Sequence, residues 1–586
     1  MKRKFCFPGR LFAVSILLTV PGIDAQPRPS SGGSFEEVID RVIAKENALM
    51  GLLRSSHPVA ETYIQDLEKD SDFGTVPKSD HYFLGKLDFS NGVAEKSFLP
   101  KSGWMPRGIP VISPMFAMRF FPEGFAQMIL IDGGAFDRGH YEFEFVRREY
   151  LGDVRTYVVS VKPREGAGRG RFLGNIWIED KGFHIVRSNG TYSGGTNARA
   201  YLHFDSWRVN AGPDLWLPAE VYTEEAALGY AMNLRKVRFK AVTRLWGYST
   251  PAERKNAEFT NMTFEQAKDS SDTAADNSPV ESRRAWEHEA ENNVLDRMEK
   301  AGMMARQGGL DKILDTVVNN LVVTNQLRIS PAVRTRALLT TPLETFTVGH
   351  TIVISRGLLD TLPDEASLAA ILAHELAHIA LGHDTDSEYA FSDRVLFDDE
   401  QTLAKFRMAR PQKEEDAANE EAVRLLMASP YKDGLGKAGL FLKALSTEAN
   451  RLPCLIKPLF GSRIAGEGKN AGADNVLRMA ALLEKAPQLQ ATRTDQVAAL
   501  PLGSRTRLDP WMDDLEMART RSVPLLSARE KMPFELAPVY IHLTYRDAGA
   551  AEGSQNAAAP NGQEGQATAN PASESSDPLA PKKPVH

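Results

Sequence analysis

Residues 369–383 read AAILAHELAHIALGH, and the interpretation of the rest of the chain depends on this stretch. It contains the pattern His-Glu-x-x-His, formed by His374, Glu375 and His378. Positions i and i+4 of a helix share one face, so both imidazoles can reach a single zinc ion. Glu375 falls at the edge of that face. There it can accept a proton from water held by the metal, because zinc lowers the pKa of that water to about 7.

The residues around the motif independently predict a helix. Pro363, Asp364 and Glu365 are typical of a first helical turn, and Gly382 is a stop signal. Apolar residues between them recur at helical spacing, at Leu368, Ile371, Leu372, Leu376 and Ile379. The chain holds 12 His and 76 Asp+Glu among 586 residues. At that composition about 0.03 such motifs are expected by chance, so the pattern is specific.

Composition and the first residues bound the class of protein. The chain is 42% hydrophobic and 25% charged with a net charge of −6, so it reads as soluble and globular, and we expect no nucleic-acid partner. Basic residues before the apolar run 11–20 predict a cleaved signal peptide, and hence a periplasmic or secreted protein. We expect association with a membrane at most, unless a retained signal anchors the chain. After cleavage Cys454 is the remaining cysteine, which excludes an internal disulfide.

The chain changes character several times along its length. We predict a multidomain α+β protein, in which a curved, half-barrel-like antiparallel sheet precedes a mostly α-helical zincin domain. The predicted segments are a signal peptide (1–25), a helical lead-in (26–79), an antiparallel β-domain (80–250), a polar linker (251–283), a zinc metallopeptidase domain with a C-terminal extension (284–546) and a disordered tail (547–586).

The β-domain carries a second, weaker pattern. Residues 171–192, RFLGNIWIEDKGFHIVRSNGTY, have the cadence of a hairpin in the LolA/LolB-like lipoprotein-sorting fold, and LHFDSWRV (202–209) resembles a further strand of it. The resemblance implies a concave apolar sheet face that holds a lipoprotein acyl chain or an extended polypeptide. A purely structural or interaction role for this domain fits the pattern equally well.

Two strand-like pieces precede the motif helix, VRTRALLT (333–340) and FTVGHTIVISRG (346–357). In many zinc peptidases an edge strand beside the metal pairs with extended substrate, because main-chain hydrogen bonds bind a peptide without reading its sequence. We assign this role to residues 343–353. The substrate edge strand would include Phe346, Thr347, Val348 and Gly349.

The third metal ligand determines the subclass of peptidase. A catalytic zinc takes three protein ligands and keeps one position open. The pattern H-E-x-x-H-x-x-G-x-x-H is rejected, because Leu381 and Asp384 replace its Gly and third His and His383 is one residue out of register. The remaining option is a Glu on the helix predicted at 412–429, where spacing alone does not choose among several glutamates.

The stretch TIVISRGLLDTLPDEASLAAILAHELAHIALGH (351–383) is similar to the gluzincin zinc metallopeptidases that include HtpX, BepA and the CAAX prenyl protease. In that family a Glu-x-x-Ala-Asp-x-x-Ala helix gives the third ligand, and residues 415–422 match it. The resemblance spans about residues 300–450. It implies that Glu415 joins His374 and His378 around one zinc per chain. The family's Asp is Asn419 here, which can hydrogen-bond a ligand but adds no charge to it.

A further departure concerns the group that stabilises the transition state. Family members have a later His-Pro stretch, and residues 492–497 (TRTDQV) place Arg493 at the His position. His383, Tyr431 and Arg493 remain three candidates for this role, and the sequence does not choose among them.

Two functions therefore stay open. The first is a zinc-dependent endopeptidase that cuts polypeptides of the envelope or secreted proteins in quality control. The alternative is a non-proteolytic periplasmic chaperone or lipoprotein- or lipid-binding protein whose peptidase domain is a scaffold. The complete motif together with Glu415 favours the first, whereas Asn419 and the missing His-Pro favour the second.

Overall fold

A computed structural model provides the structure of the chain. It describes residues 34–71, 74–99, 120–194, 202–230, 235–248, 279–383, 403, 405–464, 479–490, 493, 495–503, 505–511, 513–517 and 534–546. The predicted signal peptide, the disordered tail and residues 251–278 of the predicted linker lie outside these ranges. Within them, no helix combines the length and the apolar character needed to cross a membrane.

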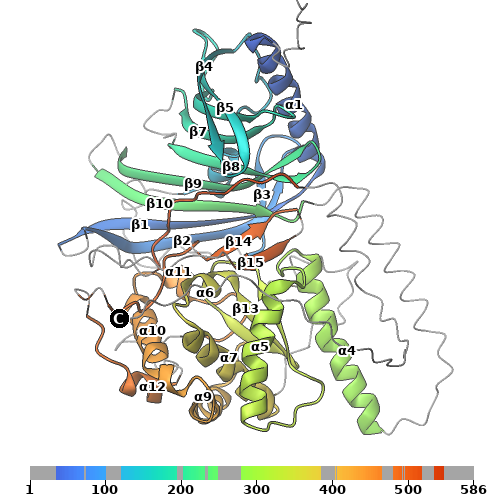
Figure 1. Cartoon of the computed structure of the whole chain (residues 1–586), viewed down its shortest axis with the longest axis vertical. Helices are drawn as coiled ribbons and strands as arrows, with labels where there is room; N and C mark the ends of the chain where they lie inside the picture. Colours follow the sequence, from blue (N-terminus) through green and yellow to red (C-terminus); the bar gives the residue numbers. More distant parts are fainter. Residues whose placement is uncertain are drawn as a thin grey trace, which may run out of the picture.

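The N-terminal domain is one ten-stranded sheet in which every pair of neighbouring strands is antiparallel. The spatial order is β3-β2-β1-β10-β9-β8-β7-β6-β5-β4, so the chain meanders and its first and last long strands meet in the middle (Figure 1). The strands are β1 (Val59–Asp70), β2 (Gly74–Asp88), β3 (Ala94–Ser97), β4 (Tyr141–Leu151), β5 (Val154–Pro163), β6 (Phe172–Glu179), β7 (Ile185–Tyr192), β8 (Phe204–Gly212), β9 (Leu215–Tyr230) and β10 (Arg235–Trp246).

Both faces of this sheet are covered. Successive side chains of a strand point to opposite faces, and in β1 Tyr63 and Ile64 accordingly join two different hydrophobic clusters. One face packs against helix α1 (Phe35–Ser55) and the short helix α2 (Pro122–Gln127). The other face is divided between the second domain and the segment 539–545, which lies on Trp177, Trp207 and Trp216.

The sheet begins at Val59 and not near residue 80, so the predicted helical lead-in (26–79) is wrong beyond α1. The reason lies in the polar residues of β1. Glu61, Thr62 and Gln65 are 2% exposed or less, so this strand is buried without showing an apolar pattern. The predicted C-terminal extension of the peptidase domain also ends differently, since residues 539–545 return to the β-domain.

The second domain surrounds a small mixed sheet with helices (Figure 1). Strand β13 lies in the middle, parallel to β11 and antiparallel to β12. The elements are α4 (Pro279–Lys300), α5 (Gly309–Thr324), β11 (Arg334–Leu338), β12 (Thr345–Val348), β13 (Thr351–Ser355), α6 (Arg356–Thr361), α7 (Glu365–Ala380), α9 (Gln412–Met427), η2 (Lys432–Gly434), α10 (Leu435–Glu448), α11 (Pro453–Ile456), α12 (Ala480–Lys485), β14 (Thr506–Asp509) and β15 (Asp514–Met517). The predicted fold class, an antiparallel β-domain followed by a helical one, is confirmed.

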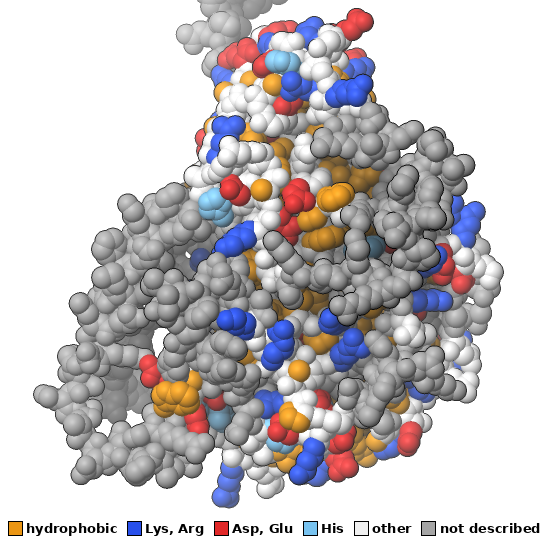
Figure 2. Space-filling model, turned by 180° about the vertical axis from the view of Figure 1, so that it is seen from behind, with side chains coloured by type: hydrophobic (Ala, Val, Ile, Leu, Met, Phe, Trp, Pro, Cys, Tyr) orange, Lys and Arg blue, Asp and Glu red, His pale blue; other side chains and the backbone are white. Residues whose placement is uncertain are grey.

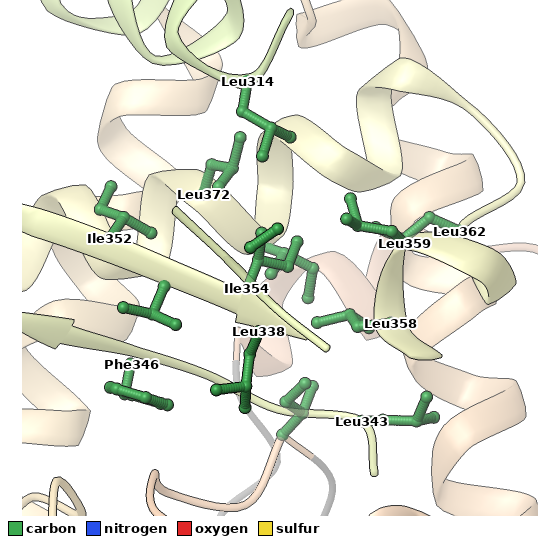
Figure 3. Close-up of a cluster of buried hydrophobic side chains, with 14 of the residues drawn as sticks. Leu314, Leu338, Leu343, Phe346, Ile352, Ile354, Leu358, Leu359, Leu362 and Leu372 are labelled. Carbon is green, nitrogen blue, oxygen red and sulfur yellow. The ribbon is translucent and has the colours of Figure 1, made fainter. Parts of the chain in front are cut away.

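The strand predicted at 346–357 is a hairpin that leads into a helix. Gly349 has a φ of +54°, a conformation that glycine adopts readily, and together with His350 it turns the chain from β12 to β13. Leucine and isoleucine side chains from this sheet and from α5, α6 and α7 then fill the core of the domain (Figure 3).

A buried ion pair joins the two domains. Glu61 of β1 and Arg356 of α6 are 1% and 2% exposed, and Arg356 Nη2 lies 2.5 Å from Glu61 Oε2. The Glu61 carboxylate also accepts hydrogen bonds from the Thr341 hydroxyl (2.7 Å) and the Tyr82 hydroxyl (2.9 Å). A charge this deeply buried needs such partners, so the packing of the two domains at this point depends on the pair.

Asp80 of β2 makes a second contact between the domains. Its carboxylate accepts hydrogen bonds from the backbone N–H groups of Cys454 (2.9 Å) and Leu455 (2.8 Å) in α11, and from the Tyr63 hydroxyl (3.0 Å). Burial raises the pKa of Asp80, and the backbone donors partly offset that rise. The residues that follow α11 are thereby held beside the sheet.

Glu344 anchors the next part of the same segment to the hairpin. It is fully buried, and its Oε2 accepts hydrogen bonds from the backbone N–H groups of Leu459 (3.0 Å), Phe460 (2.9 Å) and Gly461 (3.3 Å). Burial raises the pKa of Glu344 to about 7, although these three donors pull it down.

We predict that Glu61→Ala destabilises the protein by about 3–5 kcal/mol, because Arg356 would stay buried without its carboxylate. Thermal unfolding of the full-length chain measures the effect. Glu37→Ala is the matched control, since the Glu37–Arg41 pair is more than half exposed and is worth at most about 1 kcal/mol. Equal effects of the two substitutions would show that the buried pair does not hold the domains together.

The raised pKa of Glu344 predicts a pH dependence of stability. The folded state binds the proton more tightly than the unfolded state, so this contribution is full below pH 4.5 and is lost as the pH rises through about 7. The shift is worth about 3 kcal/mol. Wild type should therefore lose stability relative to Glu344→Gln between pH 5 and about 7.5. Denaturant unfolding at several pH values tests this, and parallel stability curves for the two proteins would refute it.

Candidate metal centre

Helix α7 carries the two histidines of the motif. Its first turn is capped by the Asp364 side chain, which accepts from the Ser367 N–H at 2.9 Å, and Gly382 follows its end with a φ of +68°. His374 and His378 are 0% and 1% exposed. Their ring centroids lie 4.8 Å apart, so one turn of helix brings the two imidazoles to the same place.

The third acidic group comes from α9, which packs against α7. Glu415 lies in the first turn of α9 and is 8% exposed. Its Oε2 lies 3.1 Å from His374 Nε2, and its Oε1 lies 3.8 Å from His378 Nε2. The two Nε2 atoms are 3.2 Å apart. The structure therefore brings His374, His378 and Glu415 together at one point.

These distances fit a tetrahedral metal. Ligands bound at about 2.0–2.1 Å to zinc lie about 3.4 Å from one another. The two Nε2 atoms are 3.2 Å apart, and each has one oxygen of Glu415 close by, Oε2 at 3.1 Å from His374 and Oε1 at 3.8 Å from His378. Two imidazoles and a carboxylate are also the donor set of catalytic zinc sites such as His₂Glu. The three residues fit a zinc ion, and its binding stays a prediction.

Glu375 is 2% exposed and follows the first histidine on α7. The converging ligand atoms of the described residues at this place belong to His374, His378 and Glu415, not to Glu375. Its role as the proton acceptor stays a prediction.

His383 lies behind the centre. Its Nδ1 is 2.8 Å from Nδ1 of His378, which is the nitrogen that faces away from His374 and Glu415. The same His383 nitrogen is 4.0 Å from a Glu414 carboxylate oxygen, and Arg410 Nη1 is 3.6 Å from that oxygen. This position suits a residue that orients the His378 ring better than one that contacts a reacting carbonyl.

Tyr431 and Arg493 make hydrogen bonds with residues other than the three candidate ligands. The Tyr431 hydroxyl donates to Glu365 Oε1 and accepts from Asn320 Nδ2, both at 3.0 Å. Glu365 opens α7, nine residues before His374, which is about 13 Å along a helix axis. The guanidinium of Arg493 donates to Asp495 on the surface. The role of both residues in stabilising the transition state stays a prediction.

Asn419 lies one turn after Glu415 on α9. Its Oδ1 accepts a hydrogen bond from the Met479 N–H at 2.9 Å, and Met479 has an unusual φ of +54°. The side chain thus holds the start of α12 in place. This hydrogen bond joins Asn419 to Met479 and not to a candidate ligand. The predicted hydrogen bond from Asn419 to a ligand stays a prediction.

A cavity of about 780 Å³ extends from Glu415 of the candidate centre to the β-domain. Glu415 and Asn419 line one part of it, and Tyr82 and Leu84 of β2 line another. Arginine and lysine side chains also contribute to its wall, at Arg407, Arg410, Lys457 and Arg463. From behind, hydrophobic and cationic side chains are seen together at the middle height of the molecule (Figure 2).

Sequence reasoning did not identify the lining from β2. Tyr82 lies 21 residues from Glu61 and several hundred from Glu415 in the chain, and no motif marks it. The sequence analysis also did not predict the contact between His383 and His378. The spacing of five residues between them was the one signal for it. The predicted edge strand is at the edge of its sheet, with the order β11-β13-β12. Its residues Phe346, Thr347 and Val348 are 2% exposed or less.

Comparison with solved structures finds matches of low similarity, two of which are described here. A DUF1329 family protein from Desulfovibrio piger shares 10% identity over 37% of this chain and 92% of its own, with a TM-score of 0.20. A proposed outer membrane lipoprotein-sorting protein domain from Vibrio parahaemolyticus shares 11% identity over 37% of this chain and 93% of its own, with a TM-score of 0.19. Both scores are too low to assign a fold or a function to the β-domain.

Comparison with curated proteins gives no significant match. Comparison with protein families gives a match that includes part of the candidate centre. Residues 314–409 match the model of Peptidase family M48. The match contains α7 with His374, Glu375 and His378, and it ends before Glu415. Residues 314–409 are therefore similar to the M48 peptidases, which indicates a metallopeptidase with polypeptide substrates.

Proposed function

We propose that the protein is a zinc-dependent endopeptidase. The observation that carries this proposal is the buried set of His374, His378 and Glu415. Glu375 follows His374 in the chain, and Glu415 lines a cavity of about 780 Å³. Ligand pockets for small molecules and peptides commonly reach 300–1,000 Å³, and this cavity falls in that range.

His374, His378 and Glu415 would hold the metal. When bound, zinc supplies Lewis acidity, which lowers the pKa of water to about 7 and polarises a carbonyl group. His383 keeps the His378 ring in one orientation through the 2.8 Å contact between their Nδ1 atoms. The apolar packing around α7 keeps bulk water from competing for the same positions.

Glu375 moves the proton. Its carboxylate accepts a proton from the attacking water and then donates it to the amine of the departing peptide. The side chain is buried, so this transfer occurs away from bulk solvent. Glu375 has no other role in this proposal. A substitution there should therefore affect catalysis without affecting metal binding.

The cavity and the edge strand β12 together suit an extended polypeptide. Phe346, Thr347 and Val348 are 2% exposed or less, backbone included, and the segment at Phe460 and Gly461 packs against β12. An added strand would therefore pair with the β12 backbone after this segment moves aside, and it would not be selected by its own sequence. Broad selection of this kind fits unfolded or misassembled proteins of the envelope. The predicted signal peptide supports a periplasmic or secreted site for this quality-control activity.

A non-proteolytic binding role is the other outcome to test. An acyl chain on the face of the sheet beside α1 is less suited to this structure, because Ile39, Val42 and Leu53 of α1 already pack there. A chaperone-like protein would still use the cavity and the edge strand for binding. It would differ from the proposed peptidase in showing no turnover.

We predict that His374→Ala releases one equivalent of zinc per chain, because His378 and Glu415 alone leave the ion with two protein ligands. Metal analysis after dialysis measures this loss. His203→Ala is the matched control, since the His203 side chain is 74% exposed on the β-domain and its Nδ1 lies 3.1 Å from Glu225 Oε1. Zinc retained in full by His374→Ala would refute the ligand assignment.

We predict that Glu375→Gln keeps its zinc and its thermal midpoint but cuts an unfolded protein such as casein 10²–10⁴-fold more slowly, since the amide has the shape of the carboxylate but cannot accept the proton. Glu420→Gln, an exposed residue of α9, should cleave at the wild-type rate. Equal cleavage by wild type and Glu375→Gln would assign the proton transfer to another residue. No cleavage by wild type would favour the binding role.

A further inference from the structure

A second group of metal-binding side chains lies away from the candidate centre. His288 and Glu291 stand one turn apart on α4, and His350 stands in the turn between β12 and β13. His288 Nδ1 is 3.2 Å from Glu291 Oε2, and the rings of His288 and His350 have centroids 5.6 Å apart. One ligand atom from each of the three residues lies within 4.8 Å of the others.

The hairpin turn is built closely against Glu291. Gly349 has a φ of +54°, and a Cβ added to it would lie 1.9 Å from Glu291 Oε2. Any larger residue would therefore push the carboxylate away from His350. The glycine brings the backbone of the turn and the carboxylate of α4 into the same small volume, which fixes the approach of His350 to the other two side chains.

His350 is suited to act as a ligand. Its Nδ1 is buried and makes no hydrogen bond within the described part of the chain. Burial lowers the pKa of His350, and neighbouring Arg334 and His288 lower it further while Glu291 raises it.

We propose that His288, Glu291 and His350 bind a transition-metal dication such as Zn²⁺, independently of the centre on α7. Two imidazoles and one carboxylate suit zinc, and a contraction from at most 4.8 Å to about 3.4 Å between ligand atoms completes three corners of a tetrahedron. The side chains of His288 and Glu291 are 41% and 20% exposed, so an ion can enter from solvent and water can take the fourth position.

This ion would have a structural effect on the peptidase domain. It would tie α4 to the hairpin that carries β12, the edge strand beside the candidate centre. The positive charge of Arg334 opposes metal binding, because its guanidinium lies 3.3 Å from Asn292 Oδ1 and 3.4 Å from Thr351 Oγ1 on the same surface. Glu291 supplies one negative charge against this repulsion. Because of Arg334, the site should bind zinc more weakly than the buried one.

Zinc content of the full-length chain tests the proposal. After saturation with Zn²⁺ and dialysis, wild type and His203→Ala should each retain two equivalents per chain. His350→Ala and His288→Ala, which change two different elements, should each retain one, and so should His374→Ala. The double variant His374→Ala/His350→Ala should retain none.

The outcomes separate the two centres. One equivalent in wild type that His350→Ala and His288→Ala both keep would overturn the second site and leave the first intact. A loss in His350→Ala and His288→Ala but not in His374→Ala would overturn the first and leave the second. A second readout guards against misfolding, because zinc should raise the thermal midpoint of His374→Ala but not that of the double variant. An equal rise in both would also overturn the proposal.

Discussion

The buried contact between Glu415 and the two imidazoles of α7 is the constraint on which the rest of the structure depends. A carboxylate and two imidazoles within 3.8 Å of one another need a compensating partner once they leave water. Apart from these groups α7 is apolar on nearly all sides, so it must be enclosed by α5, α9, α10 and the small sheet. The domain therefore encloses a polar centre, and burying these groups costs free energy of folding. A metal ion bound to them would stabilise the folded state instead.

The large sheet takes part in this arrangement. Glu61 of β1 neutralises Arg356 in the interior of the second domain, and Asp80 of β2 binds the start of α11. Through these contacts Tyr82 and Leu84 become part of the wall of the cavity that reaches Glu415. Substrate selection in the proposed peptidase would then belong to both domains, and changes at the interface would alter the cavity as well as stability.

The sequence predicted some of these features and not others, for physical reasons. The helix of the motif was predictable because Asp364, the apolar spacing and Gly382 all act locally. Glu415 could be named only through a family resemblance, since α9 also carries Glu414, Glu420 and Glu421. The Glu61–Arg356 pair spans 295 residues and leaves no pattern in the sequence. Strand β1 was not predicted for a related reason, because it buries polar residues such as Gln65 and so lacks an apolar pattern.

The most direct test of the account is anomalous X-ray scattering at the zinc edge from crystals of the full-length chain. The account predicts a peak about 2.0–2.2 Å from Nε2 of His374, Nε2 of His378 and the Glu415 carboxylate, with a coordination position left open. A fourth protein ligand in the open position would instead indicate a structural zinc site. The absence of any peak there, in protein that carries zinc elsewhere, would contradict the central claim.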